Sequence, residues 1–395
     1  MGPLDGIKVL DMSRYIAGPT ASMMLADQGA EVLKVESLPL GDPSRQSGPF
    51  VGDQSVYFMS TNRNKKSLAI DLRQGGGKAV VARLASTVDV FIENFRPGLV
   101  AEMGLGLEQL MDINPKLVYC SISGFGSGPV GSKMAGFDQT VQGMSGLMSV
   151  TGTEETGPLR VGIPIADSTT GLVAAFAIEA KLLERARTGV GGFVSTSLMQ
   201  SMTFLMTYQA QKFLSLGIVA GREGNDHPLL FPQGTFKTAD GYITIASGNE
   251  RMWRLLCTSL GLDEIAEYPQ FSTNEARLEN KVELRTRIEA CLSTGSAAEW
   301  IERIGSNGVP CGRVLNMQEA FSHEVSVELG LSKTVEHSSL GMMEVLGRPA
   351  ETGTADWLRL APPTLGENSV EILSGNGFAG AEIDELLDSG IVVQG

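Results

Sequence analysis

The chain has 395 residues, 42% of them hydrophobic and 19% charged, which excludes a disordered or fibrous protein and is enough for more than one folded domain. The formal net charge is −14 and the basic residues form no long run, so the chain lacks the concentrated positive face that nucleic-acid binding requires. Histidine occurs only three times, at 227, 323 and 337, and the first 226 residues therefore supply neither a histidine base nor a histidine-rich metal site.

Cysteine spacing and the lengths of the apolar runs indicate the compartment. The four cysteines are widely separated and form no Cys-x-x-Cys pair, which favours reduced thiols over a disulfide framework. No apolar run reaches the roughly 18 residues that a membrane-spanning helix needs. Residues 1–6 carry neither a basic nor an apolar stretch. We therefore expect a cytoplasmic protein that has no membrane or nucleic-acid partner and binds no metal.

The first 125 residues alternate apolar segments of strand length with segments of helix length. Strands are expected at 7–11, 31–36, 67–72, 88–92 and 117–122. Helices are expected at 21–28, where Gly29 ends the helix, and near 76–86 and 106–113. This alternation predicts βαβ units, a mostly parallel sheet and the α/β fold class. The first strand-to-helix turn reads Ile16-Ala17-Gly18-Pro19, so the dinucleotide-binding fingerprint is absent.

Two features in the middle of the chain are candidates for chemistry. Seven glycines between 124 and 146 predict a loop whose N–H groups approach a thioester or phosphate, with a plain flexible loop as the alternative. A helix is expected to begin near Asp167 and to run to about residue 187. A carboxylate in the first turn of a helix is favoured in its charged form and can act as a nucleophile toward an activated carbonyl. The alternative for Asp167 is an ordinary helix cap.

The remaining elements indicate a second, smaller folding unit. A strand is expected at 193–197 and a long helix at 198–216, with methionines on its core face. A hairpin at 234–247 and helices at 249–261, 274–292 and 297–304 follow a turn-rich linker, and an acidic helix is expected at 381–389. We divide the chain into a large Rossmann-like domain at 1–200, a linker helix and loop at 201–225, a small α+β domain at 226–320 and a C-terminal segment at 321–395.

Several cations have two interpretations. Lys65, Lys66 and Arg96 could contact phosphate groups, or they could form a solvated face. Arg14 follows the first strand and could pair with a substrate carboxylate or with an acidic neighbour in the protein. None of these residues identifies a function by itself.

A series of motifs in chain order resembles class III CoA-transferases, the family of formyl-CoA transferase and carnitine CoA-transferase. The motifs are Pro3–Asp11, Ala17–Pro19, Gly29–Glu36, Gly41–Arg45, Asn62–Ser67, Asp89–Gly98, Ser123–Gly126, Gly308–Gly312 and Ala361–Gly366. The resemblance implies a Rossmann-like CoA-binding domain at 1–200, to which the segment 321–395 returns, and a small α+β domain. It also implies a homodimer whose two chains are interlocked like rings.

The resemblance also implies the site. The family's nucleophilic aspartate matches Asp167, whose carboxylate would form an aspartyl anhydride with the donor acyl group and then an aspartyl-CoA thioester. No cofactor would be bound permanently, because the coenzyme A thioester is itself a substrate. The implied CoA contacts are Tyr15, Ile16, Ala17, Ile70, Asp71, Leu72, Arg73, Asn94, Phe95, Arg96, Ala135, Gly136, Phe137 and Asp138.

Departures from the family pattern bear on the reaction. Phe137 stands where the related α-methylacyl-CoA racemases have a catalytic histidine, which argues for a transferase. A racemase-type isomerase and a catalytically dead CoA-binding protein remain the alternatives. Thr196 and Asn368 replace a frequent aspartate and a frequent histidine of the family. Only the spaced Gly221 and Gly224 stand where formyl-CoA transferases carry consecutive glycines, which argues against an oxalate-type enzyme.

Within the family, the chain is most similar to the glutarate-type succinyl-CoA:dicarboxylate CoA-transferases. The stretches Phe50–Gly52, Ser60–Ser67, Ser145–Met148 and Gly390–Gln394 carry this likeness. A dicarboxylate acceptor needs a cation for its distal carboxylate, and Arg14, Arg45 and Arg160 are the candidates. The acceptor itself stays open among glutarate, itaconate, mesaconate, citramalate, malate and an aromatic succinate.

Overall fold

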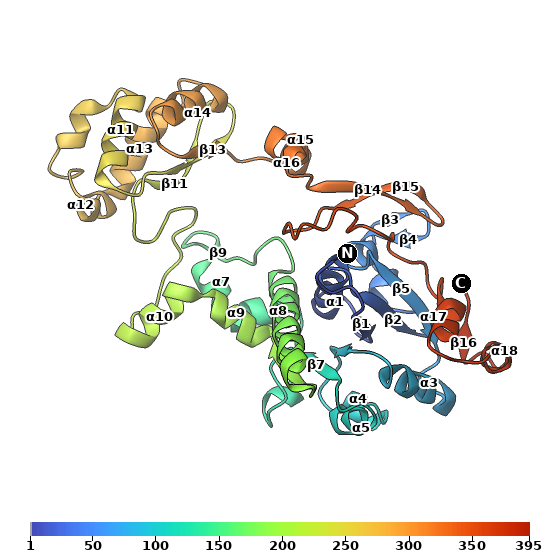
Figure 1. Ribbon diagram of the computed structural model, residues 1–395. Coiled ribbons are helices and arrows are strands. Elements are labelled where there is room, and N and C mark those ends of the chain that lie inside the picture. The colour runs from blue at the N-terminus through green and yellow to red at the C-terminus, as the bar shows by residue number, and fades with distance from the viewer. Residues whose placement is uncertain (1) are drawn as a thin grey trace. The chain divides into compact units, whose positions relative to one another are not determined.

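The computed structural model describes residues 2–395, which form two compact units (Figure 1). The first unit contains the described residues up to 148 together with 160–218 and 329–395. The second unit contains 149–159 and 219–328. The first unit is therefore assembled from three separate stretches of the chain, and the last of them is the C-terminal stretch 329–395.

A seven-stranded sheet forms the centre of the first unit. Its strands run in the order β10 (Gly192–Ser197), β7 (Val118–Ser123), β6 (Val90–Glu93), β1 (Lys8–Asp11), β2 (Glu31–Ser37), β5 (Lys65–Ile70) and β16 (Val392–Val393). Neighbouring strands are parallel except for β16, which is antiparallel to β5. This confirms the expected α/β class with a mainly parallel sheet. Because β2 and β6 flank β1, the strand order reverses at β1, which is where α/β sheets bind ligands.

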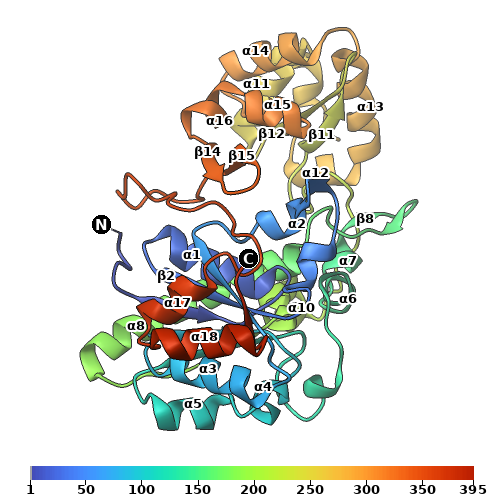
Figure 2. The ribbon, with the colours of Figure 1, turned by 90° about the vertical axis from the view of Figure 1, so that its right-hand side faces the viewer.

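Helices cover both faces of this sheet because neighbouring residues of each strand point to opposite sides. On one face, Val9 and Val32 pack with α1 (Ala17–Asp27), α6 (Asp138–Met144), α8 (Ile165–Thr188) and α9 (Leu198–Leu205). On the other face, Leu10 and Leu33 pack with α3 (Gly75–Ala85), α4 (Leu99–Glu102), α5 (Leu107–Ile113), α17 (Ser369–Gly375) and α18 (Gly380–Asp388). Figure 2 shows α17 and α18 beside α3 on this second face.

The close approach of α8 to α1 depends on a glycine. A Cβ added at Gly171 would lie 2.6 Å from the Cβ of Thr20 and 2.7 Å from the carbonyl oxygen of Ala17. Only a residue without a side chain therefore fits between the two helices at this point. Gly171 lies in the second turn of α8, so the contact brings the first turn of α8 close to the first turn of α1.

The C-terminal stretch is fastened to the rest of the first unit through Asn64. Its side-chain oxygen accepts the N–H groups of Arg359 and Leu360 at 2.7 and 3.0 Å, and its Nδ2 donates to the carbonyl of Trp357 at 2.9 Å. The same stretch contains the hairpin β14 (Ser332–His337) and β15 (Gly341–Leu346). These hydrogen bonds therefore fix the conformation of residues 357–360 against Asn64, the residue that precedes β5.

The second unit has its own core. Strands β11 (Gln233–Lys237), β12 (Tyr242–Ala246) and β13 (Cys311–Arg313) form an antiparallel sheet. This sheet packs with α11 (Glu250–Leu260), α13 (Lys281–Leu292) and α14 (Ala297–Ser306) around the buried side chains of Phe236, Trp253 and Ile288. The remaining elements of the chain are η1 (Pro43–Gln46), β3 (Phe50–Val51), β4 (Gln54–Ser55), α2 (Val56–Met59), η2 (Gly131–Lys133), α7 (Leu147–Val150), β8 (Gly152–Thr153), β9 (Gly157–Pro158), α10 (Thr207–Leu216), η3 (Asp263–Glu267), α12 (Asn274–Glu279), α15 (Met317–Ser322) and α16 (Glu324–Glu328).

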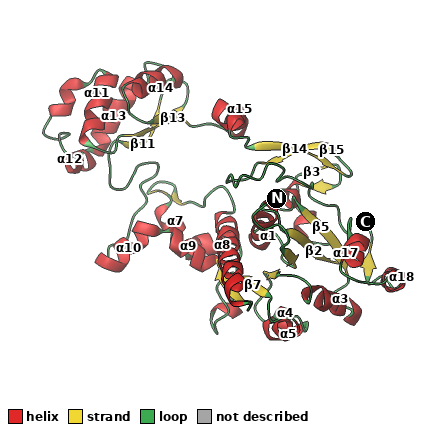
Figure 3. Cartoon of the chain, viewed as in Figure 1, coloured by secondary structure: helices red, strands yellow, loops and turns green. Residues whose placement is uncertain are grey.

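Two of the expected helices are divided (Figure 3). Three antiparallel strand pairs, β3–β4, β8–β9 and β14–β15, were not expected. The helix expected at 198–216 breaks into α9 and α10, and Thr207 at the break has φ = 41°. The helix expected at 274–292 breaks at Asn280 into α12 and α13.

Across residues 2–395 no helix is long and apolar enough to cross a membrane, and no group of three or more acidic, histidine or cysteine residues could hold a metal ion.

Candidate active site

A cavity of about 700 Å³ opens at the carboxyl ends of β1, β6 and β7. Its wall is formed by residues at or just after the ends of these strands, namely Arg14, Tyr15, Ala17, 94–97 and 122–124. The loop 132–139, the segment from Arg160 to Asp167, Tyr57 and Leu198 complete the wall. All of these residues belong to the first unit. The cavity therefore lies at the strand-order reversal, where loops from several strands meet.

Asp167 is the third residue of α8 and its carboxyl group faces this cavity. Burial and the negative charge of Asp138 raise the pKa of Asp167 to about 7. Within residues 2–395 no hydrogen-bond donor and no cation partners this carboxylate. A carboxylate that lacks partners and is partly desolvated is more reactive as a base or nucleophile than one held by hydrogen bonds.

Asp138 explains why the start of α8 does not stabilise the Asp167 anion. Its Oδ1 accepts the backbone N–H groups of Ala166 at 2.8 Å and of Asp167 at 3.3 Å. Its Oδ2 accepts a hydrogen bond from Gln142 Nε2 at 2.6 Å, which fixes the carboxylate in this position. The N–H groups at a helix start normally stabilise anions, and here Asp138 uses them. The two carboxylates therefore differ in role, since one caps the helix and the other is exposed to the cavity.

Two glycines allow the loops that line the cavity to touch. A Cβ added at Gly124 would lie 2.5 Å from the Cα of Gly136, and one added at Gly136 would lie 2.4 Å from the Cα of Gly124. These distances are shorter than any real contact, so both positions need glycine. Of the glycine-rich loop expected at 124–146, Gly124 and residues 132–139 line the cavity, whereas Asp138–Met144 form the helix α6, which was not expected.

We expect Gly136→Ala to lower the affinity for an acyl-CoA by at least about tenfold, because the new methyl group must displace the backbone at Gly124. Isothermal titration with coenzyme A measures this change. Gly128→Ala is the matched control, because a Cβ at Gly128 meets no atom within 4 Å. An unchanged affinity in Gly136→Ala would contradict the need for this backbone contact.

The charges on the cavity wall have the opposite sign to the net charge of the chain. Four cations, Arg14, Arg96, Lys133 and Arg160, line the cavity against two carboxylates, Asp138 and Asp167. Among the described residues, neither Arg14 nor Arg160 has a carboxylate partner, and the guanidinium of Arg14 lies over the ring of Phe95 at 4.3 Å. With four cations and two anions on the wall, the cavity favours an anionic ligand although the chain carries −14.

Aromatic side chains line the same cavity. The rings of Tyr15 and Phe137 meet edge to face with centroids 6.4 Å apart, and both are exposed in the cavity wall. Burial, together with the negative charges of Asp167 and Asp138, raises the pKa of the Tyr57 phenol. Phe137 thus presents to the cavity an apolar ring that carries no titratable group.

The two other departures from the family pattern lie away from the cavity wall. Thr196 is buried in β10, and its hydroxyl lies 3.5 Å from that of Ser201. The side chain of Asn368 accepts the N–H of Ser67 at 3.1 Å and donates to Glu371 at 3.0 Å. Both residues therefore have local hydrogen-bond partners in place of those that an aspartate or a histidine would use.

The structure brings most of the expected site residues together. Those on the cavity wall are Tyr15, Ala17, Asn94, Phe95, Arg96, Ala135, Gly136, Phe137, Asp138, Asp167, Arg14 and Arg160. Ile16 is buried beside them and does not face the cavity. The segment Ile70–Arg73 begins at the last residue of β5, two strands away from β1, and the side chains of Ile70 and Leu72 lie in the core. Asp71 and Arg73 pair with each other there.

Arg45 lies outside the cavity wall, which argues against it as the cation for the distal carboxylate. Its guanidinium is bound to Glu36 through two hydrogen bonds of 2.7 Å and to the carbonyl of Pro363 at 3.0 Å. It also lies over the ring of Phe58 at 3.6 Å. These contacts commit two of the three guanidinium nitrogens of Arg45 to protein groups, and its side chain is only 10% exposed.

Tyr57 and Lys133 line the cavity and were not expected from the sequence. Tyr57 lies in the four-residue helix α2, where no periodicity marks it. Lys133 is the only cation between residues 124 and 146, and this single charge in a glycine-rich loop was the available signal.

Comparison with known proteins agrees with this fold. Residues 4–369 match CoA-transferase family III. The succinyl-CoA:glutarate CoA-transferase of Mus musculus is 39% identical over 100% of this chain and 91% of its own length. The succinate–glutarate CoA-transferase of Agrobacterium fabrum is 36% identical over 94% of this chain and 95% of its own length. The crystal structure of a CAIB/BAIF family protein from Brucella suis superposes with a TM-score of 0.85, at 36% identity, over 95% of this chain and 100% of that one.

The parallel sheet, the cavity at its strand-order reversal and the match along nearly the whole chain define a CoA-dependent enzyme. The chain belongs to CoA-transferase family III. It is thus a CoA-transferase, and acyl-CoA thioesters are its class of substrate.

Proposed function

We propose that this enzyme transfers CoA from succinyl-CoA or a similar donor to a small dicarboxylic acid, with Asp167 as the nucleophile. The observation that carries the proposal is the Asp167 carboxylate, which faces the cationic cavity without a partner in the described chain. The names of the relatives in Mus musculus and Agrobacterium fabrum support succinyl-CoA and glutarate as the first pair of substrates to test.

In the first half of the proposed reaction, the Asp167 carboxylate attacks the thioester carbonyl carbon. The C–S bond breaks, CoA leaves as the thiolate, and the acyl group forms a mixed anhydride with Asp167. The thiolate then attacks the Asp167 carbonyl of the anhydride. Succinate leaves and an aspartyl-CoA thioester remains. No proton has to be transferred in these steps, which agrees with a cavity wall that carries no histidine.

In the second half, the acceptor carboxylate attacks the aspartyl-CoA thioester and releases the thiolate, so that a new mixed anhydride forms. The thiolate attacks the acceptor's carbonyl in this anhydride. The new acyl-CoA forms and the Asp167 carboxylate is regenerated. Because both halves are chemically equivalent, the equilibrium constant stays near one, and the enzyme needs no further energy source.

A dicarboxylate acceptor fits the cations of the cavity. One carboxylate has to reach the reacting carbonyl at Asp167, and the other then needs a cation elsewhere on the wall. Arg14 and Arg160 have no carboxylate partner within residues 2–395, so they are available for this contact. We assign the distal carboxylate to these two arginines.

We assign the adenosine end of CoA to the segment Ile70–Arg73. Strands in a sheet are about 4.8 Å apart, so the three steps from β6 to β5 measure about 14 Å along the carboxyl edge. An extended CoA molecule is long enough to reach from the cavity to this segment. Tyr15 and Asn94 would contact its middle part, and Arg96 would pair with its phosphates.

A homodimer is part of the proposal, and the exposed surface of the first unit supports it. Phe176 on α8, Phe204 on α9 and Leu214 on α10 are 74%, 78% and 74% exposed. Apolar side chains exposed along successive helices are typical of a surface that another chain covers. Sedimentation equilibrium should give twice the mass of one chain, and a monomer at micromolar concentration would contradict the dimer.

The decisive experiment is a mass-spectrometric assay of succinyl-CoA with a panel of acceptor acids. We expect glutaryl-CoA or another dicarboxylyl-CoA and an equal amount of free succinate, while acetate and other monocarboxylates react far more slowly. With hydroxylamine present and no acceptor, the modified peptide should carry a hydroxamate at Asp167. Transfer to monocarboxylates at an equal rate, or modification of another residue, would contradict the proposal.

A further inference from the structure

The segment 13–15, which links β1 to α1 and presents Arg14 and Tyr15 to the cavity, has no regular structure of its own. Side chains from other elements satisfy its backbone instead. The side chain of Asn94 binds both backbone polar groups of Arg14. It accepts the Arg14 N–H at 2.8 Å and donates to the Arg14 carbonyl at 2.7 Å. Asp42 Oδ1 accepts the N–H of Tyr15 at 3.1 Å.

Tyr15 needs such support because its backbone has φ = 64°. This left-handed conformation is unfavourable for residues with a side chain and is adopted freely only by glycine. A non-glycine residue keeps it only where surrounding contacts impose it. The contact that acts on the Tyr15 peptide group itself is the one from Asp42.

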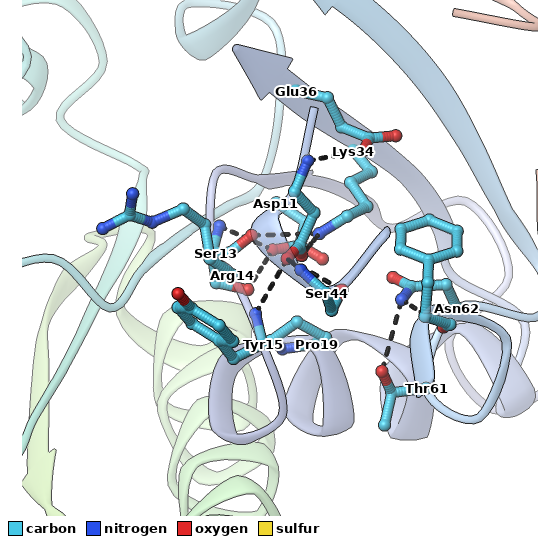
Figure 4. Close-up of polar contacts among 12 residues, drawn as sticks. Asp11, Ser13, Arg14, Tyr15, Pro19, Lys34, Glu36, Ser44, Thr61 and Asn62 are labelled. Carbon is cyan, nitrogen blue, oxygen red and sulfur yellow. Dashed lines mark hydrogen bonds and ion pairs between the residues drawn. The ribbon is translucent and has the colours of Figure 1, made fainter. Parts of the chain in front are cut away.

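Asp42 is held in place by an ion pair with Lys34. The Lys34 ammonium lies 3.0 Å from Asp42 Oδ2 and donates to the carbonyl of Ser13 at 2.9 Å. Lys34 is fully buried and Asp42 is 2% exposed. One ammonium group thus connects the carboxylate that binds Tyr15 with the start of the same segment. Figure 4 shows the Lys34 and Asp11 side chains converging beside Ser13, while Arg14 and Tyr15 extend away from them.

The charges around this pair are balanced. The carboxylates of Asp11, Glu36 and Asp42 are buried with the cations of Lys34, Arg45 and Lys65, three charges of each sign. Ser44 also donates to Asp42 Oδ1 through its N–H at 2.9 Å and its hydroxyl at 2.8 Å. A buried ion pair costs much of its attraction in desolvation, so stability alone is a weak reason for this arrangement.

We propose that Asp42 and Lys34 are positioning residues, which hold Tyr15 in its left-handed conformation so that Tyr15 and Arg14 face the acyl-CoA. Neither residue lines the cavity, so both act through the segment 13–15. The inference rests on the proposed function in so far as the cavity binds CoA. The contact between Asp42 and the Tyr15 amide is independent of it.

Asp42→Asn tests this role with little change of shape. The amide group places NH₂ against either the Tyr15 N–H or the Lys34 ammonium. The variant therefore loses either the contact with Tyr15 itself or the Lys34 contact that holds the residue 42 side chain in place, and both losses loosen the Tyr15 peptide group. We expect the Tyr15 amide to exchange hydrogen at least about tenfold faster and the Kd for coenzyme A to rise by at least about tenfold. Unchanged exchange and unchanged binding in the folded variant would overturn the proposal.

Asp27→Asn is the matched control. Asp27 is also nearly fully buried and also pairs with a cation, Arg63, but it contacts no residue of the segment 13–15. We expect this control to lose stability while keeping the affinity for coenzyme A. Equal losses of affinity in the two variants would mean that Asp42 acts only through general stability, against the proposal.

A double-mutant cycle separates backbone positioning from every other effect of Asp42. Tyr15→Ala and Tyr15→Gly remove the same ring, but only glycine adopts φ = 64° without support. With Asp42 present, the two variants should bind coenzyme A about equally. With Asp42→Asn, the alanine variant should bind about tenfold more weakly than the glycine variant. Equal binding by the two variants in the Asp42→Asn background would overturn the proposal.

The test still gives an answer if Asp42→Asn does not fold or if the enzyme does not bind coenzyme A. If Asp42→Asn does not fold, Ser44→Ala removes one donor to Asp42 and keeps both charges. Faster exchange of the Tyr15 amide in this variant then supports the proposal and unchanged exchange opposes it. If the unaltered enzyme fails to bind coenzyme A, the proposed function fails. The exchange measurement needs no ligand and still decides whether Asp42 holds Tyr15.

Discussion

Asp167→Asn is expected to lower kcat for CoA transfer by about 10⁴-fold or more, because the amide keeps the shape of the side chain but cannot attack a thioester. The Kd for coenzyme A should change little, since the substitution removes only the reacting group. Liquid chromatography of the acyl-CoA products measures the rate and calorimetry measures the binding. A variant that retains a tenth of the activity would exclude Asp167 as the nucleophile.

The pKa of Asp167 also predicts how the rate depends on pH. Because burial and Asp138 raise this pKa to about 7, the reactive carboxylate is a minor species in acid. We expect kcat/KM to fall about tenfold for each pH unit below 7 and to level off above it. Asp138→Asn removes a nearby negative charge and should move the inflection to lower pH. An inflection near pH 4 in the unaltered enzyme would contradict the raised pKa.

The carboxyl group of Asp167 should also lower the stability of the folded enzyme. Its pKa is about 7 in the folded chain and about 3.9 in the unfolded chain, so between these values the folded state binds more protons. Stability therefore falls as the pH rises from 4 to 7, and above 7 the whole penalty is present. We expect Asp167→Asn to raise the thermal midpoint at pH 8 by about 2–4 °C and to have little effect at pH 4. Scanning calorimetry at the two pH values tests this sign.

Asp11→Asn should have the largest effect on stability. Asp11 is fully buried, its Oδ2 lies 3.1 Å from the Lys65 ammonium, and it accepts hydrogen bonds from Ser13 and Ser22. Burial alone would raise the pKa of Asp11, but the charges of Lys65 and Lys34 and these hydroxyl groups hold it well below its usual value. The Asn variant leaves the Lys65 ammonium buried without its counter-charge. We expect a loss of about 3–5 kcal/mol in the free energy of unfolding.

Urea unfolding followed by circular dichroism measures this loss. Lys66→Met is the control, because the neighbouring Lys66 pairs with Glu31 and Glu371 at partly exposed positions and should change stability by at most about 1 kcal/mol. The stabilising effect of Asp11 is present above the unfolded pKa near 3.9 and disappears as the pH falls through the lower folded value. A loss below 1 kcal/mol for Asp11→Asn would show that Lys65 finds sufficient partners in the carbonyl of Pro19 and in Asn62.

Much of the first unit could be predicted from local patterns. The expected strand segments are short and apolar, and all six parallel strands of the sheet lie within about two residues of the expected ranges. Gly29 ends α1 as expected, with φ = 113°. Such features depend on neighbouring residues, and a sequence records them directly. The breaks at Thr207 and Asn280 carry neither glycine nor proline, so no local signal marked them.

The site was predictable only in part, for a physical reason. Spacing alone placed Asp167 in the first turn of a helix and left an ordinary cap as the alternative. The cap of α8 is instead Asp138, which lies 28 residues earlier in the chain than Ala166 and reaches the helix through the fold. Arg45 was predicted for substrate because its partner Glu36 belongs to a different element, and pairing of that kind is decided by tertiary packing.

The discontinuous first unit has a consequence for biosynthesis. Strand β5 is complete once residue 70 has been made, but its edge partner β16 lies at Val392–Val393. During translation the edge of β5 therefore stays open for almost the entire time on the ribosome, while most of the second unit, residues 219–328, emerges earlier. An open strand edge is a template for pairing with other chains. The yield of this protein in cells should thus depend on chaperones that shield β5 until the final residues are released.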